Sequence, residues 1–193
     1  MGEFQELYAI WGKSKLDPAF REELMLAVAR QNDAPYCSWM HRTLAELAGS
    51  SREVIEKIEL LDPRGLDARK WAAVAYVRGL ASNDMKPVSG QLRRRVEAHF
   101  SQREIEDIEL VARAMDLINR MANTFDAMVS RLQGKPAADS DILDQGVFSG
   151  LFAAVAPPLV LLLAHYARRP VIEMARGLVD HVQPFYAQTA RRG

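Results

Sequence analysis

Apolar residues recur every three to four positions along nearly the whole chain, and this spacing most constrains what the chain can fold into. Such spacing places apolar side chains on one face of an α-helix. No alternating run of five or more residues flanked by hairpin turns indicates a β-strand. The sequence therefore predicts an all-α fold. Its 193 residues suit one domain.

The most apolar segment runs from Val147 to Ala164, which is 18 residues without a charge. That length is near the lower limit for a helix that crosses a membrane. Pro157 and Pro158 lie in its middle, where they remove two backbone donors and favour a break into two short helices. We therefore expect a buried or subunit-interface segment and no membrane association.

Composition excludes several classes of protein. The 25 Lys and Arg residues are balanced by 25 Asp and Glu residues, so the strong positive field that nucleic-acid binding needs is missing. The sole cysteine, Cys37, excludes an internal disulfide, a Cys-x-x-Cys pair and a multi-cysteine zinc site. Residues 1–20 show no signal-peptide pattern. We expect a cytoplasmic protein without a metal or cofactor.

Two helices are indicated near the start of the chain. Asp17 followed by Pro18 is typical of a helix N-terminus, and the helix is expected to run over residues 18–31. The turn NDAP follows, and Pro35 suits the first position of a second helix, which Gly49 closes. Because the first helix is apolar on most faces, it is expected to be central.

Three further helices have recognisable starts. The segment Ser50–Glu53 has capping-box spacing before VIEKIELL, and Asp67 can cap a helix through ARKWAAVAYVRGLA. The segment Ser101–Glu104 repeats the capping-box spacing and opens the longest periodic segment, residues 102–133.

The clearest loop in the sequence is GKPAADSD, residues 134–141, which we interpret as a linker. Beyond it we expect a C-terminal helical extension over residues 142–193. It contains the apolar segment, a helix through VIEMARGLVDHV after Pro170, and a tail behind Pro184. The whole chain, 1–193, is expected to form one all-α domain.

Cys37 and His41 form the richest local arrangement of reactive side chains. Their i, i+4 spacing makes them neighbours on one helix face. Positive charge on His41, or a hydrogen bond from it, favours the thiolate, and so does a position in the first helical turn. An antiparallel return through NDAP can bring Glu22 or Glu23 towards the same helix, where a carboxylate would orient the imidazole.

Simpler interpretations of Cys37 and His41 are also compatible with the sequence. A lone cysteine on an apolar helix is usually a small core residue. Three mixed ligands, Glu22, Cys37 and His41, are a weak basis for a metal site. The sequence contains no G-x-S-x-G, P-loop or G-x-G-x-x-G motif, so hydrolase, NTPase and dinucleotide-binding functions lack support.

The segment REELMLAVARQNDAPYCSWMHRTLAELAGSSREVIEKI resembles the AhpD-like, carboxymuconolactone decarboxylase superfamily. The family pattern is a Glu, an apolar helix, then Asn-Gly-Cys-x-Tyr-Cys-x-x-x-His. By this resemblance Glu22 matches the family Glu, Cys37 the second cysteine and His41 the histidine. A looser likeness covers an AhpD-like core over residues 15–130. It implies a multi-helical fold packed around the helix that carries Cys37 and His41.

The chain departs from this pattern at Ala34, which stands where AhpD-like members carry the first cysteine. In members with both thiols, the second cysteine attacks a hydroperoxide and the first resolves the product as a disulfide. The resemblance therefore implies hydroperoxide reduction, an antioxidant activity, by Cys37 alone, with His41 and Glu22 as a proton relay. Resolution then requires an external thiol reductant or Cys37 of the partner subunit.

Two other functions are compatible with the resemblance. The superfamily includes lactone decarboxylases without the cysteine pair, so His41 and Glu22 can instead act on a small organic acid. Such a substrate calls for a basic residue, and Arg42, Arg120 and Arg30 are candidates. The chain can also be a binding or assembly protein without catalysis. In each case the resemblance implies a homo-oligomer, a trimer or hexamer.

Overall fold

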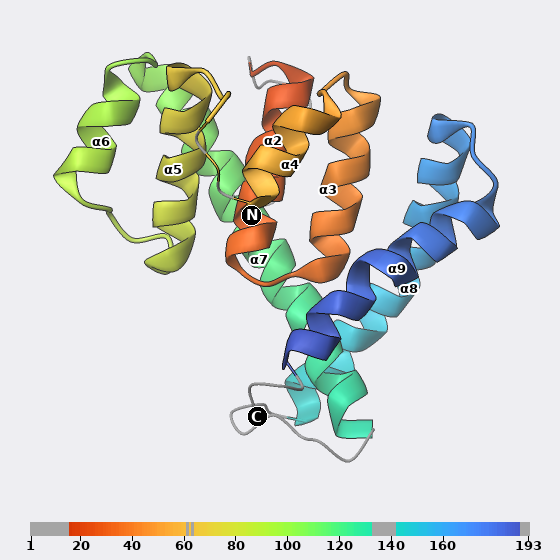
Figure 1. Ribbon diagram of the computed structural model, residues 1–193. Helices are drawn as coiled ribbons and strands as arrows, with labels where there is room; N and C mark the ends of the chain where they lie inside the picture. Colours follow the sequence, from red (N-terminus) through yellow and green to blue (C-terminus); the bar gives the residue numbers. More distant parts are fainter. Residues whose placement is uncertain (1–15, 61, 63, 133–141, 190–193) are drawn as a thin grey trace. The chain divides into compact units, whose positions relative to one another are not determined.

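A computed structural model describes residues 16–60, 62, 64–132 and 142–189 of the chain (Figure 1). Within these residues it contains eight helices and no strand, which confirms the all-α prediction. The chain forms two units. Of the described residues, the first unit takes 16–33 and Met40–Leu117, and the second takes Ala34–Trp39 and the residues from Ile118 onward.

The first unit is built around α2, as its apolar sequence predicts. Every residue from Glu22 to Ala29 is buried, and α2 packs against α4 and α5. The unit contains most of α3 and the first half of α7. The helices concerned are α2 (Pro18–Gln31), α3 (Pro35–Leu47), α4 (Arg52–Leu60), α5 (Ala68–Ser82), α6 (Gly90–Glu97) and α7 (Gln102–Leu132).

Most helix starts follow the predicted caps. The Asp17 carboxylate accepts a hydrogen bond from Phe20 N at 3.0 Å, and Asp67 caps α5 in the same way. At α7, Ser101 N donates to Glu104 at 2.8 Å while Ser101 Oγ accepts from Glu104 N, a complete capping box.

The predicted cap of α4 is wrong by one residue. Ser51 Oγ, and not that of Ser50, accepts the hydrogen bond from Val54 N at the start of the helix. The Ser50 hydroxyl donates to the buried Glu23 carboxylate instead. A long-range contact therefore takes the side chain that local spacing assigned to the cap.

One helix, α6, has no counterpart in the sequence-based prediction. Ser89 caps it by accepting from Leu92 N at 3.5 Å. It packs closely on α5, because a Cβ atom at Gly79 would lie 2.7 Å from Leu92 Cδ1. Glycine at this position therefore permits the close approach of the two helices.

The second unit joins the first turn of α3 to the C-terminal half of α7 and to two further helices, α8 (Ile142–Ala167) and α9 (Val171–Thr189). The Tyr36 and Phe125 rings meet edge to face with centroids 6.1 Å apart. A Cβ built at Gly177 would lie 3.6 Å from Trp39 Nε1, so α9 packs against Trp39. The helices α8 and α9 pack together as a hairpin.

Prolines do not interrupt the C-terminal helices, so two predictions are wrong. Helix α8 continues through Pro157 and Pro158, and α9 continues through Pro184 to Thr189. A proline φ near −65° is itself helical, and these three prolines are exposed, so water can hydrate the carbonyls whose donors are lost. As a result, Ser149–Ala167 is one helix long and apolar enough to cross a membrane by length and composition.

The predicted linker at 134–141 lies outside the described residues. The division into two units passes through α3 and α7. The single domain over 1–193, with a core at 15–130 and an extension at 142–193, stays a prediction from the sequence.

Candidate active site

The strongest candidate for a functional group is a buried carboxylate–imidazole pair between α2 and α3. His41 Nδ1 lies 2.7 Å from Glu22 Oε2. The two side chains are only 3% and 6% exposed. Both residues belong to the first unit. The structure thus brings together two residues that are 19 positions apart in the sequence, as the antiparallel return through NDAP predicts.

The contact fixes which nitrogen of His41 can accept a proton. With Glu22 as a carboxylate, which only accepts, Nδ1–H is the donor in this hydrogen bond. In a neutral imidazole Nε2 then carries the lone pair. His41 Nε2 is buried and has no hydrogen-bond partner among the described residues. The pair therefore presents a buried proton acceptor.

A cation next to the pair balances the buried carboxylate. Arg21 Nε lies 3.4 Å from Glu22 Oε1, the oxygen that His41 does not use. The two carboxylate oxygens therefore have different partners. Sequence reasoning did not single out Arg21, because an i, i+1 pair on a helix gives no signal by spacing.

The neighbouring Glu23 points to a different part of the fold. Its carboxylate lies 2.7 Å from Lys70 Nζ on α5 and accepts from Ser50 between α3 and α4. Successive helical residues point about 100° apart. Of the two glutamates that the spacing left open, Glu22 is the one beside His41, and Glu23 ties three segments of the first unit together.

Cys37 lies in the first turn of α3, one helical turn before His41 on the same helix. It is 3% exposed. The turn before it is tight, because Asp33 adopts a φ of 48°, which aspartate tolerates better than most residues. Ala34, in the place of the family's first cysteine, is completely buried.

The three arginines proposed for an anionic substrate differ in their surroundings. Arg42 follows His41 directly, but it forms ion pairs with Glu59 at 2.5 Å and with Glu46 at 3.8 Å. Arg120 is exposed on α7, and Arg30 is half-buried at the end of α2. Arg42 is therefore already neutralised.

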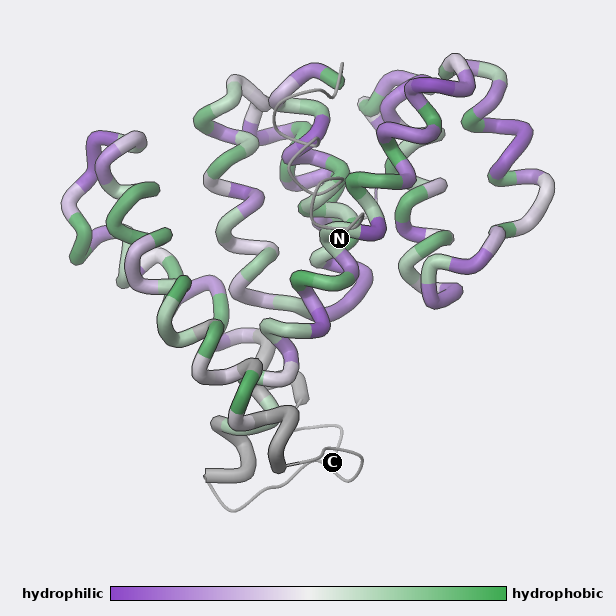
Figure 2. Tube along the Cα trace, turned by 180° about the vertical axis from the view of Figure 1, so that it is seen from behind, coloured by the Kyte–Doolittle hydropathy of each residue, from purple (hydrophilic) through white to green (hydrophobic). Residues whose placement is uncertain are grey.

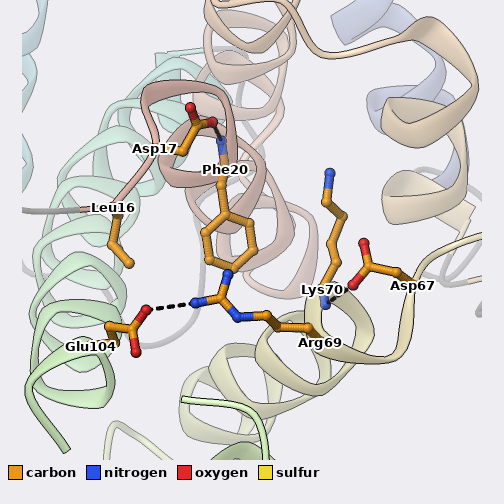
Figure 3. Close-up of a pocket in the computed structure, with 7 residues that line it drawn as sticks. All are labelled: Leu16, Asp17, Phe20, Asp67, Arg69, Lys70 and Glu104. Carbon is orange, nitrogen blue, oxygen red and sulfur yellow. Dashed lines mark hydrogen bonds and ion pairs between the residues drawn. The ribbon is translucent and has the colours of Figure 1, made fainter. Parts of the chain in front are cut away.

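A separate pocket of about 480 Å³ lies in the first unit, at the starts of α2 and α5 (Figure 3). Its polar side chains already have partners within the fold. Arg69 pairs with Glu104 at 2.6 Å and lies 4.2 Å above the Phe100 ring, while Asp17 and Asp67 cap helices. The contacts serve the fold, so we assign no chemistry to this pocket.

Within the described residues, no group of three or more His, Cys, Asp or Glu side chains is placed to hold a metal ion. Two polar residues outside the predicted site are completely buried, Ser38 next to Cys37 and Asn119 on α7.

The fold and the site define a class of all-α protein in which a Glu–His pair and a first-turn cysteine occupy two adjacent helices. Residues 5–79 match the model of the Carboxymuconolactone decarboxylase family. Glu22, Cys37 and His41 all lie inside the match. The resemblance to the superfamily is therefore confirmed. No curated protein matches the chain.

Proposed function

We propose that this protein reduces small hydroperoxides through a single reactive cysteine, Cys37. The observation that carries the proposal is the buried hydrogen bond between His41 and Glu22, with Nε2 left as a proton acceptor. The match of residues 5–79 to the Carboxymuconolactone decarboxylase family supports a function of the AhpD-like or decarboxylase type. The i, i+4 spacing of Cys37 and His41 favours the former, because it brings a thiol next to a base.

In the proposed reaction His41 takes the Cys37 proton, and the thiolate attacks the terminal oxygen of the hydroperoxide. An S–O bond forms while the O–O bond breaks, so that the sulfur is oxidised by two electrons and the peroxide is reduced. The leaving alkoxide recovers the proton from His41 and departs as an alcohol. Cys37 is left as a sulfenic acid.

Resolution needs an external thiol because Ala34 carries none. A first thiol condenses with the sulfenic acid, releases water and forms a mixed disulfide with Cys37. A second thiol then attacks the external sulfur, which restores Cys37 and yields the disulfide of the reductant. A cytosolic thiol pool supplies this reductant, so the proposal includes a cytoplasmic location.

The first test is the pH dependence of Cys37 oxidation by a small organic hydroperoxide, with the sulfenic acid trapped and located by mass spectrometry. We expect rapid trapping with an apparent pKa below about 7 for the thiol, against about 8.5 for free cysteine. His41→Ala should slow the reaction, whereas His99→Ala, which alters an exposed histidine, should not. Oxidation of the wild type at the rate of a free thiol would contradict the proposal.

A decarboxylase-type reaction is the second candidate, favoured by the intact His41–Glu22 pair together with Ala34 in place of the first cysteine. Here His41 moves the proton and Cys37 only lines the site. One variant distinguishes the two candidate functions. Cys37→Ser abolishes peroxide reduction but preserves acid/base turnover of a lactone acid, which His41→Ala abolishes. If neither variant changes any activity, the chain is a binding protein.

A further inference from the structure

Arg21 occupies a position in α2 that the stability of the helix does not explain. It is the fourth residue of the helix, at the end of the first turn, where the partial positive charge of the helix dipole disfavours a cation. Its side chain is nonetheless only 13% exposed. An arginine that is largely buried at the unfavourable end of a helix needs a partner of opposite charge.

That partner is the Glu22 carboxylate. Arg21 Nε and Nη2 lie 3.4 Å and 3.5 Å from Glu22 Oε1, and both donate to it. The other oxygen, Oε2, lies 2.7 Å from His41 Nδ1. Glu22 thus links the Arg21 guanidinium to the His41 imidazole, and all three side chains belong to the first unit.

The charges of the three side chains indicate what Arg21 does for His41. One cation and one carboxylate sum to zero, so the buried group is neutral when the imidazole is neutral, and Nε2 then has its lone pair. Without Arg21 the carboxylate is a buried negative charge, which a second proton on His41 would balance. A protonated ring has no lone pair and cannot accept the proton of Cys37.

The other charges next to the pair in the sequence already have partners. Arg42 pairs with one glutamate of α4 at 2.5 Å and with one of α3 at 3.8 Å, and Glu23 pairs with Lys70 of α5 at 2.7 Å. Within the described part of the chain, Arg21 is therefore the cation that balances Glu22.

We propose that Arg21 is a positioning residue, which holds Glu22 as a carboxylate turned towards His41 and so keeps His41 neutral and able to accept a proton. This inference rests on the proposed peroxide reduction for its effect on Cys37. Its effect on His41 can be measured without a substrate. Arg21 acts through Glu22 and does not touch the reacting atoms.

The first measurement is the protonation of His41 at neutral pH without a substrate. Long-range proton–nitrogen NMR spectra report both ring nitrogens of each histidine, and the His41 signals are those that His41→Ala removes. We expect a neutral ring with its proton on Nδ1 in the wild type. Arg21→Met should move both nitrogens towards the shifts of a protonated ring, whereas Arg21→Lys, which keeps the charge, should preserve the neutral ring.

The second measurement is the rate of Cys37 oxidation by hydrogen peroxide at neutral pH. Arg21→Met should slow it about tenfold, the effect of moving a proton equilibrium by about one pH unit. In a Glu22→Gln background the same exchange should have no further effect, because Arg21 acts through that carboxylate. Arg113→Met is the matched control. It removes an arginine of α7 that pairs with Glu109 at 3.7 Å, and it should change neither measurement.

The two measurements distinguish the failure of this inference from the failure of the proposed function. A protonated His41 in the wild type, a neutral His41 in Arg21→Met, or an equal loss of rate with and without the Glu22 carboxylate would overturn the role of Arg21. If His41 responds as expected but the wild-type thiol reacts no faster than free cysteine, peroxide reduction is overturned and the role of Arg21 stands. If Arg21→Met does not fold, Arg21→Gln repeats both measurements.

Discussion

Two adjacent glutamates on α2 have different partners. One contacts the histidine of the candidate site, and the other connects parts of the fold. Glu22 meets His41, whereas Glu23 meets Lys70 and Ser50. The sequence alone predicts only that one of them reaches the Cys–His helix, because side-chain direction depends on the exact crossing of α2 and α3. The family pattern resolves the choice by counting residues. The burial of polar residues such as Ser38 depends on tertiary packing and leaves no motif.

Exchanging each glutamate for glutamine should therefore affect a different property of the protein. Glu22→Gln removes the charge that stabilises protonated His41, so Cys37 oxidation should slow about tenfold to a hundredfold. Glu23→Gln leaves Lys70 without its buried partner and should cost about 2 kcal/mol in the free energy of unfolding, with little effect on the rate. Stopped-flow oxidation and urea titration measure the two effects. The same loss of rate in both variants would contradict this division.

Ala34, which is buried, offers a test of whether a cysteine at this position can form a disulfide with Cys37. Positions 34 and 37 are separated by one turn at the start of α3, so Ala34→Cys places two thiols within reach of each other. After treatment with peroxide we expect an intramolecular disulfide, detected as the loss of two hydrogens by mass spectrometry, and turnover with a dithiol reductant. Persistence of the sulfenic acid would show that the turn cannot bring the two sulfurs together.

At the scale of elements, local chemistry predicts most helix bounds well but overestimates the effect of prolines inside a helix. Asp17, Asp67 and the Ser101–Glu104 box act as predicted, because a cap depends on residues within one turn. Pro157 does not end α8, because a proline on an exposed helix face loses little once water reaches the freed carbonyl. Helix α6 was missed since its packing against α5 depends on Gly79, a long-range feature.

The capping box of α7 predicts a measurable pH dependence. The pKa of Glu104 is lowered chiefly because the backbone N–H and hydroxyl of Ser101 donate to its carboxylate, with a smaller contribution from Arg69. A carboxyl with a lowered pKa adds stability above its unfolded value of about 4.3, and this stability is lost as the pH falls through the folded pKa.

Glu104→Gln should therefore cost about 1 kcal/mol at neutral pH, and the difference from the wild type should shrink as the pH falls below about 4. Urea titrations across this range measure the effect. Glu56→Gln, at an exposed glutamate of α4, is the control and should change little. A difference that stays constant with pH would show that the hydrogen bonds, and not the charge, stabilise the start of α7.

At the scale of the whole molecule, the apolar period was sufficient to predict the fold class, because nearly every helix buries one face. The exception is α8, which is apolar around its whole circumference and is little buried within its own chain (Figure 2). The sequence predicts that such a helix is buried, but it does not identify the molecule that buries it.

If copies of the chain associate through the exposed apolar residues of α8 and α9, the stability of the protein must depend on its concentration. Association stabilises only the folded state, so the thermal midpoint should rise as the protein concentration increases. Calorimetry over a hundredfold range of concentration should show a rise of several degrees for the wild type, and a constant midpoint for Leu161→Glu with Leu162→Glu. Leu60→Glu should behave as the wild type. A midpoint that does not move with concentration in the wild type would mean that the hairpin is stable without a partner, and that its apolar surface has another use.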